Sequence, residues 1–153
     1  MPIQARLQED LKQAMRDKDT VRRSVLRYLR SEIHNEEIAK QTELDDEGII
    51  RMLTRQVQQR RDSVEVYEAA NRQDLVDKEK GELAIIFEYM PEQMSREDVI
   101  NLVRQAIEEA GATGPGDMGK VMGRIMPQVR GKTDGKEVSS IVSEELKRLA
   151  DAE

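Results

Sequence analysis

The residues best suited to hold a charged ligand gather between Gly111 and Lys136, where glycines interrupt the regular apolar pattern of the chain. This stretch contains five Lys or Arg and two Asp, although the 153-residue chain has a net charge of −6. The five cations are Lys120, Arg124, Arg130, Lys132 and Lys136. A local positive charge in an acidic protein favours a negatively charged partner, and phosphate groups are the first candidate.

Two segments of this stretch approach the spacing of a nucleotide-binding P-loop. In the first, Lys120 follows a glycine-rich loop, but Val121 occupies the position of the hydroxyl that holds Mg²⁺ and no apolar β-run precedes the loop. In the second, Thr133 supplies the hydroxyl, but Met126 stands where the first glycine is required. We therefore predict no nucleotide site. The motif residues are instead predicted to form helix starts and turns; they are Asp117, Gly119, Gly131, Asp134 and Gly135.

The other reactive side chains do not assemble into a recognisable catalytic or metal centre. The chain has no Cys, and its one histidine, His34, has no partner at metal-ligand spacing. A group of carboxylates lies among lysines at helix-surface spacing, with no nucleophile or apolar pocket implied nearby. This group comprises Asp74, Asp77, Glu79 and Glu82. We predict no catalytic residue, no metal and no cofactor.

The composition also bears on where the protein works. The absence of Cys favours an intracellular location, because disulfides belong to oxidising compartments. No apolar run approaches the length of a membrane span, and residues 1–20 are charged throughout, unlike a signal peptide. We therefore predict a cytoplasmic protein with no membrane partner.

Apolar residues recur at helical spacing along the whole chain, which predicts an all-α fold. Four helices are expected in a long-helix amino-terminal domain, residues 1–92, and shorter ones in a small three-helix carboxy-terminal domain, residues 93–150. The boundary is placed at Pro91–Met94, because this segment separates the long helices from shorter ones punctuated by glycine. Pro91 closes the fourth helix, since the residue before a proline is pushed out of the helical region. Pro127 is expected either to kink or to end the second helix of the small domain.

Two repeated patterns have a structural and a functional interpretation. Arg23, Arg27 and Arg30 follow i, i+4, i+7 spacing on one helix face. We interpret this stripe as a solvated surface, partly neutralised by Glu32, Glu36 and Glu37, with contact to RNA as the alternative. Three methionines at four-residue spacing are interpreted as core rather than as a ligand-binding surface; they are Met118, Met122 and Met126.

Several short motifs resemble those of the free-standing YqeY-like proteins of bacteria, over essentially the whole chain. They are Arg16–Asp19, Gln59–Ser63, Arg72–Leu75, Tyr89–Pro91, Asp117–Met122 and Gly131–Gly135. The carboxy-terminal part is also similar to the tail domain of the B subunit of the tRNA-dependent amidotransferase. The resemblance implies an all-helical protein of two parts and, through the tail domain, contact with tRNA. The positions that match this tail pattern are Gly119, Lys120, Gly131 and Lys132.

These observations lead to one functional hypothesis and two alternatives. The hypothesis is an accessory protein without catalysis of its own, binding tRNA or a tRNA-associated complex through the five cations named above. The first alternative is a helical protein-interaction module that takes a protein partner. The second, implied by the resemblance, is a subunit related to the amidotransferase, a carbon–nitrogen ligase with glutamine as amido donor.

Overall fold

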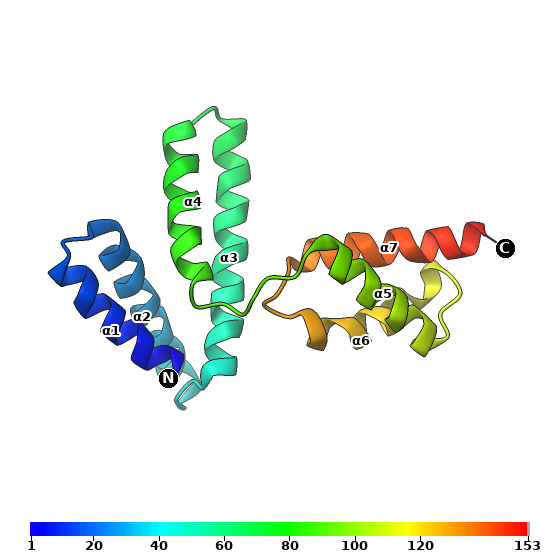
Figure 1. Cartoon of the computed structure of the whole chain (residues 1–153), viewed down its shortest axis with the longest axis horizontal. Coiled ribbons are helices and arrows are strands. Elements are labelled where there is room, and N and C mark those ends of the chain that lie inside the picture. The colour runs from blue at the N-terminus through cyan, green and yellow to red at the C-terminus, as the bar shows by residue number, and fades with distance from the viewer. Residues whose placement is uncertain (153) are drawn as a thin grey trace. The chain divides into compact units, whose positions relative to one another are not determined.

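The computed structural model describes residues 1–152 and is all-α, which confirms the predicted fold class. Within these residues there are seven α-helices, one short 3₁₀ helix and no strand (Figure 1). The chain divides into two compact units, an amino-terminal unit of Met1–Met90 and a carboxy-terminal unit that begins at Pro91. Each unit has a buried apolar cluster of its own.

The amino-terminal unit consists of two helical hairpins. The first joins α1 (Ile3–Arg16) to α2 (Thr20–Lys40), and the second joins α3 (Asp46–Ala69) to α4 (Gln73–Phe87), as Figure 1 shows. Leucines and isoleucines at helical spacing are buried where the hairpins pack together. The fully buried members of this core include Leu7, Leu26, Leu29, Ile49, Leu53 and Ile86.

Two aspartates, Asp19 and Asp45, are the N-caps of α2 and α3. The Asp19 carboxylate accepts a hydrogen bond from the Arg22 amide at 3.1 Å, and Asp45 accepts one from the Gly48 amide at 2.8 Å. At its far end, α2 extends beyond Ile33, its last buried residue. The helix continues to Lys40, although Ile38 is 63 % exposed and adds nothing to the core.

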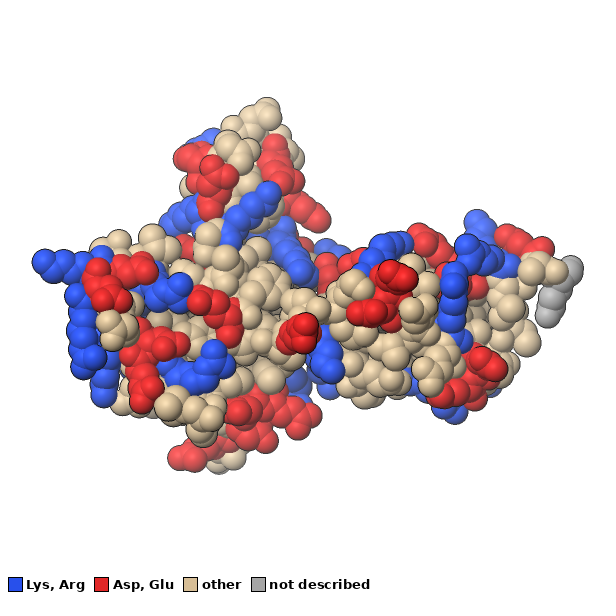
Figure 2. Space-filling model, in the orientation of Figure 1, with Lys and Arg blue, Asp and Glu red and all other residues tan. Residues whose placement is uncertain are grey.

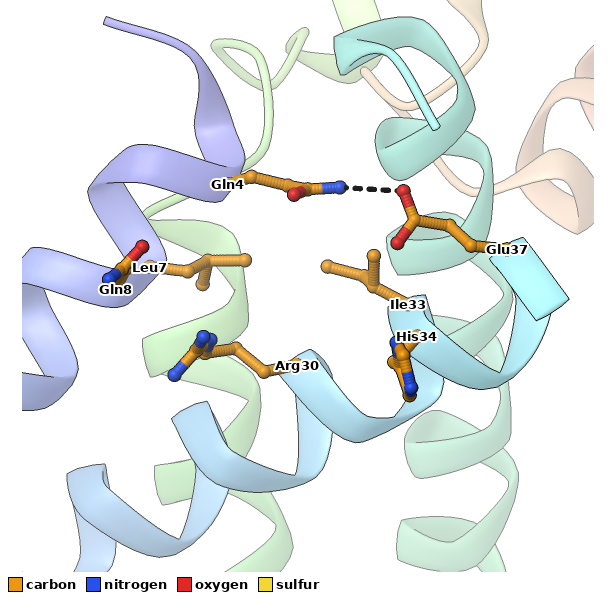
Figure 3. A pocket seen from close by; sticks show the side chains of 7 residues that line it. All are labelled: Gln4, Leu7, Gln8, Arg30, Ile33, His34 and Glu37. Carbon is orange, nitrogen blue, oxygen red and sulfur yellow. Dashed lines mark hydrogen bonds between the residues drawn. The ribbon is translucent and has the colours of Figure 1, made fainter. Parts of the chain in front are cut away.

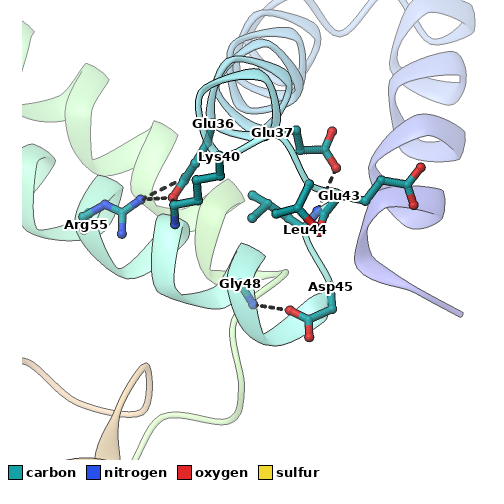
Figure 4. A network of polar contacts seen from close by, with 9 residues as sticks. Glu36, Glu37, Lys40, Glu43, Leu44, Asp45, Gly48 and Arg55 are labelled. Carbon is teal, nitrogen blue, oxygen red and sulfur yellow. Dashed lines mark hydrogen bonds and ion pairs between the residues drawn. The ribbon is translucent and has the colours of Figure 1, made fainter.

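Polar contacts hold the connection between α2 and α3 (Figure 4). Glu36 accepts from Arg55 of α3 at 2.9 Å and pairs with Lys40 at 2.7 Å. The adjacent Glu37 accepts from the Leu44 amide at 2.8 Å. Lys40, with Arg55, lowers the pKa of the Glu36 carboxyl. The last two turns of α2 are therefore held by ion pairs and hydrogen bonds rather than by apolar burial.

The second hairpin extends beyond the apolar core and is held there by a partly buried ion-pair group. Arg60 of α3 lies 3.3 Å from Glu79 of α4 and also pairs with Glu82, and all three side chains are less than one-fifth exposed. The prediction that these two glutamates lie on a solvated surface is wrong, because they face Arg60 across the hairpin. The Arg60 guanidinium also lies over the ring of Tyr28, 5.7 Å from its centroid.

A second polar group joins the end of α4 to the first hairpin. The Tyr89 hydroxyl donates to the Asp10 carboxylate at 2.5 Å, and the Arg6 guanidinium lies 4.9 Å from the centre of the Tyr89 ring. Arg22 pairs with Glu88 at 2.6 Å. Burial, followed by the hydrogen bond to Asp10, raises the pKa of Tyr89 well above its usual range.

We expect Tyr89→Phe to lower the free energy of unfolding by about 1–2 kcal/mol at pH 8, because Asp10 loses its donor. The raised pKa also predicts a pH effect. An unfolded tyrosine ionises near pH 10, so Tyr89 stabilises the native protein fully below that pH and less as the pH rises beyond it. Urea unfolding at pH 8 and pH 11 measures both effects. A Tyr89→Phe protein that loses as much stability as wild type between these two pH values would contradict the assignment.

The carboxy-terminal unit is a three-helix domain formed by α5 (Arg96–Ala110), α6 (Met118–Val129) and α7 (Gly135–Asp151), with the 3₁₀ helix η1 (Pro115–Asp117) before α6. Val121, Ile125 and Val129 place one face of α6 in the core. The three methionines of α6 pack against this core and are partly buried. Pro127 lies inside α6, which ends two residues later at Val129.

Candidate nucleic-acid interface

The predicted cations occupy two places in the carboxy-terminal unit. Lys120 and Arg124 lie four residues apart on α6, so they share one exposed helix face. Arg130 and Lys132 belong to the turn after α6, and Lys136 to the first turn of α7. All five residues are exposed. Ten residues of helix separate Lys120 from Arg130, which corresponds to about 15 Å along the axis. The five cations therefore form two groups rather than one cluster.

On the exposed face of α6, two glycines leave the main chain uncovered next to the cations. Gly119 and Gly123 lie on the side opposite the buried valines, and a Cβ added at either would meet nothing within 4 Å. A glycine inside a helix costs about 0.8–1 kcal/mol relative to alanine, and no close packing in this unit requires these two. Their effect is to leave the helix backbone open beside Lys120 and Arg124, where a ligand can approach closely.

The turn after α6 is held by main-chain hydrogen bonds. Gly131 has a φ of +79°, a conformation that favours glycine. Its carbonyl accepts from the Gln93 side chain at 2.8 Å, and the Lys132 carbonyl accepts from the Met94 amide at 2.8 Å. The backbone of Lys132 is thus fixed on both sides while its side chain is exposed. This arrangement presents a cation at a low cost in backbone entropy on binding.

Two aspartates next to the cations play different parts. The Asp134 carboxylate accepts from the Lys136 amide at 3.0 Å at the start of α7. Asp117 was expected to cap α6 in the same way, and this is wrong. Its carboxylate accepts from the Thr113 amide at 2.9 Å, and no side chain caps α6. The Thr113 amide, together with the charge of Lys120, lowers the pKa of Asp117.

Neighbouring carboxylates determine how strongly each of these cations can bind an anion. Arg124 lies 3.7 Å from Glu109, and both side chains are about half exposed. Such a pair is weak in water and can open for a competing phosphate. Glu137, at the start of α7, accepts from Arg96 at 3.1 Å. Among the described residues, no carboxylate forms an ion pair with Lys120, Arg130 or Lys132.

The chemistry available at this surface is the binding of anions. Exposed Lys and Arg beside open backbone can contact phosphate oxygens, which fixes position without reading sequence. Within residues 1–152, no group of three or more His, Asp or Glu is arranged to hold a metal ion. In the same range, no helix is both long enough and apolar enough to cross a bilayer.

Comparison with known proteins defines the family. The family model described as "Yqey-like protein" matches residues 4–146, so the chain belongs to the YqeY-like family. It is a helical protein of that family, with two compact units.

Among curated relatives, the chain is similar to "Altered inheritance of mitochondria protein 41, mitochondrial" of Pyrenophora tritici-repentis. The two are 31 % identical over 142 residues, which are 91 % of this chain and 78 % of the relative. Proteins of the same name from Saccharomyces cerevisiae and Vanderwaltozyma polyspora are 41 % and 40 % identical over 85 residues. In both yeast relatives the match covers 55 % of this chain and 46 % of the relative, less than half of its length.

These names contradict the predicted cytoplasmic location. Each of the three relatives is named as a mitochondrial protein, so the prediction made from composition is wrong. The composition on which that prediction rests does not distinguish the cytoplasm from the interior of an organelle. A chain without cysteine and without a long apolar run suits the interior of an organelle as well as the cytoplasm.

Two parts of this surface were missed by the sequence analysis. Gly123 was not selected, although its spacing of four residues from Gly119 places both on one side of α6. Gln93 and Met94, which hold the Lys132 turn, lie far from it in sequence, and no local pattern reveals that contact.

Proposed function

We propose that the carboxy-terminal unit binds the sugar–phosphate backbone of tRNA, alone or within a tRNA-associated complex. The exposed Lys132 on its fixed turn is the main support for this proposal. Lys120 and Arg124 add a second contact point on α6, where Lys120 lies about 15 Å from Arg130 along the axis, a distance that several successive phosphates of an RNA strand can span. The similarity of this part to the tail domain of the amidotransferase B subunit supports tRNA as the nucleic acid.

The binding expected from so few cations is weak and sensitive to salt. Each phosphate neutralised adds about 0.7–0.9 to the slope of log K against log salt. We expect Lys120→Ala with Lys132→Ala to reduce this slope by about two and to weaken binding at 50 mM salt by about tenfold. Fluorescence anisotropy with labelled bulk tRNA at 50 and 200 mM salt measures both quantities.

A matched control removes two exposed lysines elsewhere, Lys78 on α4 and Lys147 on α7. Lys78→Ala with Lys147→Ala makes the same change in net charge and is expected to leave the slope within experimental error of wild type. The proposal fails if wild type does not bind tRNA at 50 mM salt, or if the two double variants bind alike.

A second candidate function, docking of a protein, is favoured by one feature of the same unit. A depression of about 460 Å³ lies between the ends of α5 and α7, with Ile107, Ala112 and Leu149 in its wall. Its rim carries Arg104 and Glu145, paired at 3.1 Å. An apolar floor with a charged rim is typical of a protein-binding site. Co-purification before and after nuclease treatment separates the candidates, because only a protein partner would survive the nuclease.

A further inference from the structure

The densest positive charge of the chain lies outside the surface described so far, on the first helical hairpin. Residues 11–30 contain seven Lys or Arg and two Asp, a net charge of +5 in a chain of −6. Figure 2 shows Lys and Arg side chains gathered at the end of the amino-terminal unit where α1 joins α2. This cluster is more basic than the carboxy-terminal stretch, which has five cations and two acids between Gly111 and Lys136.

One face of α2 organises these charges. Arg23, Arg27, Arg30 and His34 are spaced i, i+4, i+7 and i+11, so they follow one side of the helix for about 16 Å. The neighbouring helix completes the face, because the Arg27 guanidinium contacts the Met15 sulfur of α1 at 4.0 Å. We call the four side chains on α2 the arginine face.

Two of the three acids that were expected to neutralise this face, Glu36 and Glu37, are engaged elsewhere. Glu36 is bound by Arg55 and Lys40. Glu37 accepts from the Gln4 side chain at 3.0 Å and from the Leu44 amide at 2.8 Å. The third, Glu32, follows Arg23 by nine residues and so lies on the opposite side of α2. Asp19, at the start of the helix, pairs with Arg22 at 3.5 Å.

The three arginines of the face consequently keep their charge available to a ligand. In the part of the chain that the structure describes, none of Arg23, Arg27 and Arg30 has an ion pair. The interpretation of this stripe as neutralised surface is not supported by the contacts.

A small polar pocket continues the arginine face toward the start of α1 (Figure 3). Gln4 and Gln8 of α1 line it opposite Arg30, His34 and Glu37 of α2, and Leu7 and Ile33 form its floor. The Glu37 carboxylate at its edge is held by the Gln4 amide. Its volume is about 210 Å³, below the range of 300–1,000 Å³ common for drug-sized ligands. The pocket therefore suits one small polar group, such as a base or a ribose, rather than a whole cofactor.

We propose that the arginine face binds a single-stranded segment of RNA, with phosphates along Arg23, Arg27 and Arg30 and one base or ribose in the Gln4–Gln8–His34 pocket. Guanidinium groups bind phosphate through two parallel hydrogen bonds. Amide and imidazole groups can donate to and accept from a base edge or a 2′-hydroxyl. This surface belongs to the amino-terminal unit, and the proposal does not depend on binding by the carboxy-terminal unit.

An anionic membrane is the main competing partner for a basic helix. A membrane-binding helix places apolar side chains beside its cations so that they can enter the lipid. The exposed apolar residues of α2 do not meet this requirement. Val21 and Tyr28, 55 % and 42 % exposed, lie on the side of the helix away from the arginine face. Among the described residues, two exposed apolar side chains lie on the side of the arginine face: Met15, which contacts Arg27, and Ile38, one turn beyond His34 at the far end of α2. They lie far apart and form no continuous apolar stripe beside the arginines. Phosphate groups in a strand fit this surface better than a lipid layer.

The test uses the full chain and a labelled single-stranded RNA of twelve nucleotides, with anisotropy read at 50 and 200 mM salt. We expect Arg23→Gln, Arg27→Gln and Arg30→Gln together to lower the salt slope by about two and to weaken binding at 50 mM salt at least tenfold. Gln8→Ala with His34→Ala should weaken binding about threefold or more without changing the salt slope, because these side chains contact the base or ribose and no phosphate. Circular dichroism confirms that each variant remains helical.

Two comparisons make the outcome specific. Lys120→Ala with Lys132→Ala is expected to leave binding of this short RNA within twofold of wild type, so loss in that variant alone would support the carboxy-terminal surface and overturn this proposal. The proposal is also overturned if the triple arginine variant binds RNA like wild type, or if vesicles containing phosphatidylserine bind the wild-type protein while the RNA does not.

Discussion

Replacing Arg60 by methionine is expected to lower the free energy of unfolding by about 3 kcal/mol. The substitution keeps most of the apolar volume of the side chain but removes its charge. Glu79 and Glu82, whose side chains are 18 % and 17 % exposed, then remain together without a cation. Removing one partner of a buried ion pair is costly, because the remaining charge keeps its desolvation penalty. Urea unfolding followed by circular dichroism measures the change.

The partners of Arg60 provide a direct check of this cause. Combining Arg60→Met with Glu79→Gln and Glu82→Gln removes the stranded charges, so this triple variant should recover most of the lost stability. Arg72→Met is the matched control, because Arg72 pairs with Asp74 at the exposed end of the same hairpin. We expect little change there. Equal losses of unfolding free energy in Arg60→Met and Arg72→Met would show that burial of the ion pair does not increase its contribution to stability.

Ile33→Ala is expected to destabilise the amino-terminal unit by 2–5 kcal/mol, the range typical of large-to-small changes in a core. Ile33 is 3 % exposed and belongs to the buried cluster where the two hairpins meet. Its loss removes apolar burial and deepens the polar pocket whose floor Ile33 forms with Leu7, so water gains access to the core. Thermal or urea unfolding of the full chain gives the change for this unit.

The same helix supplies a control of identical chemistry. Ile38 also lies on α2 but is 63 % exposed. Ile38→Ala deletes the same atoms and should change the free energy of unfolding by no more than about 0.5 kcal/mol. A loss at Ile38 as large as that at Ile33 would mean that residue 38 is covered in solution, and the exposure described for α2 would be wrong.

The apolar pattern of the sequence was sufficient to predict the helices, because periodic burial is a local signal. Leu7 and Leu11 on α1, or Val121 and Ile125 on α6, mark the faces that are buried in the structure. The end of α2 was not predictable in this way. Its last turns are held by Glu36 and Glu37 through residues of the following loop and helix.

Polar contacts between distant residues account for the other differences. Nothing near Glu79 in sequence indicates that it faces Arg60, nineteen residues earlier. Likewise, spacing alone suggests that Glu36 neutralises the arginines of α2, although in the structure it forms an ion pair with Arg55 of α3. Spacing along a helix identifies neighbours on the same helix only. The cations of the candidate interface were predictable by type and position, whereas the hydrogen bonds that fix Lys132 were not.

The second hairpin has a consequence for how the amino-terminal unit opens. α3 has 24 residues, and its outer valine, Val64, together with Val76 of α4, is buried but lies outside the apolar cluster shared by the two hairpins. The tip is thus stabilised by contacts between two helices alone, and local unfolding there costs less than unfolding of the whole unit. Thermal fluctuations will melt the turn between Ala69 and Gln73 first, and a protease can cleave there while the four-helix base stays intact.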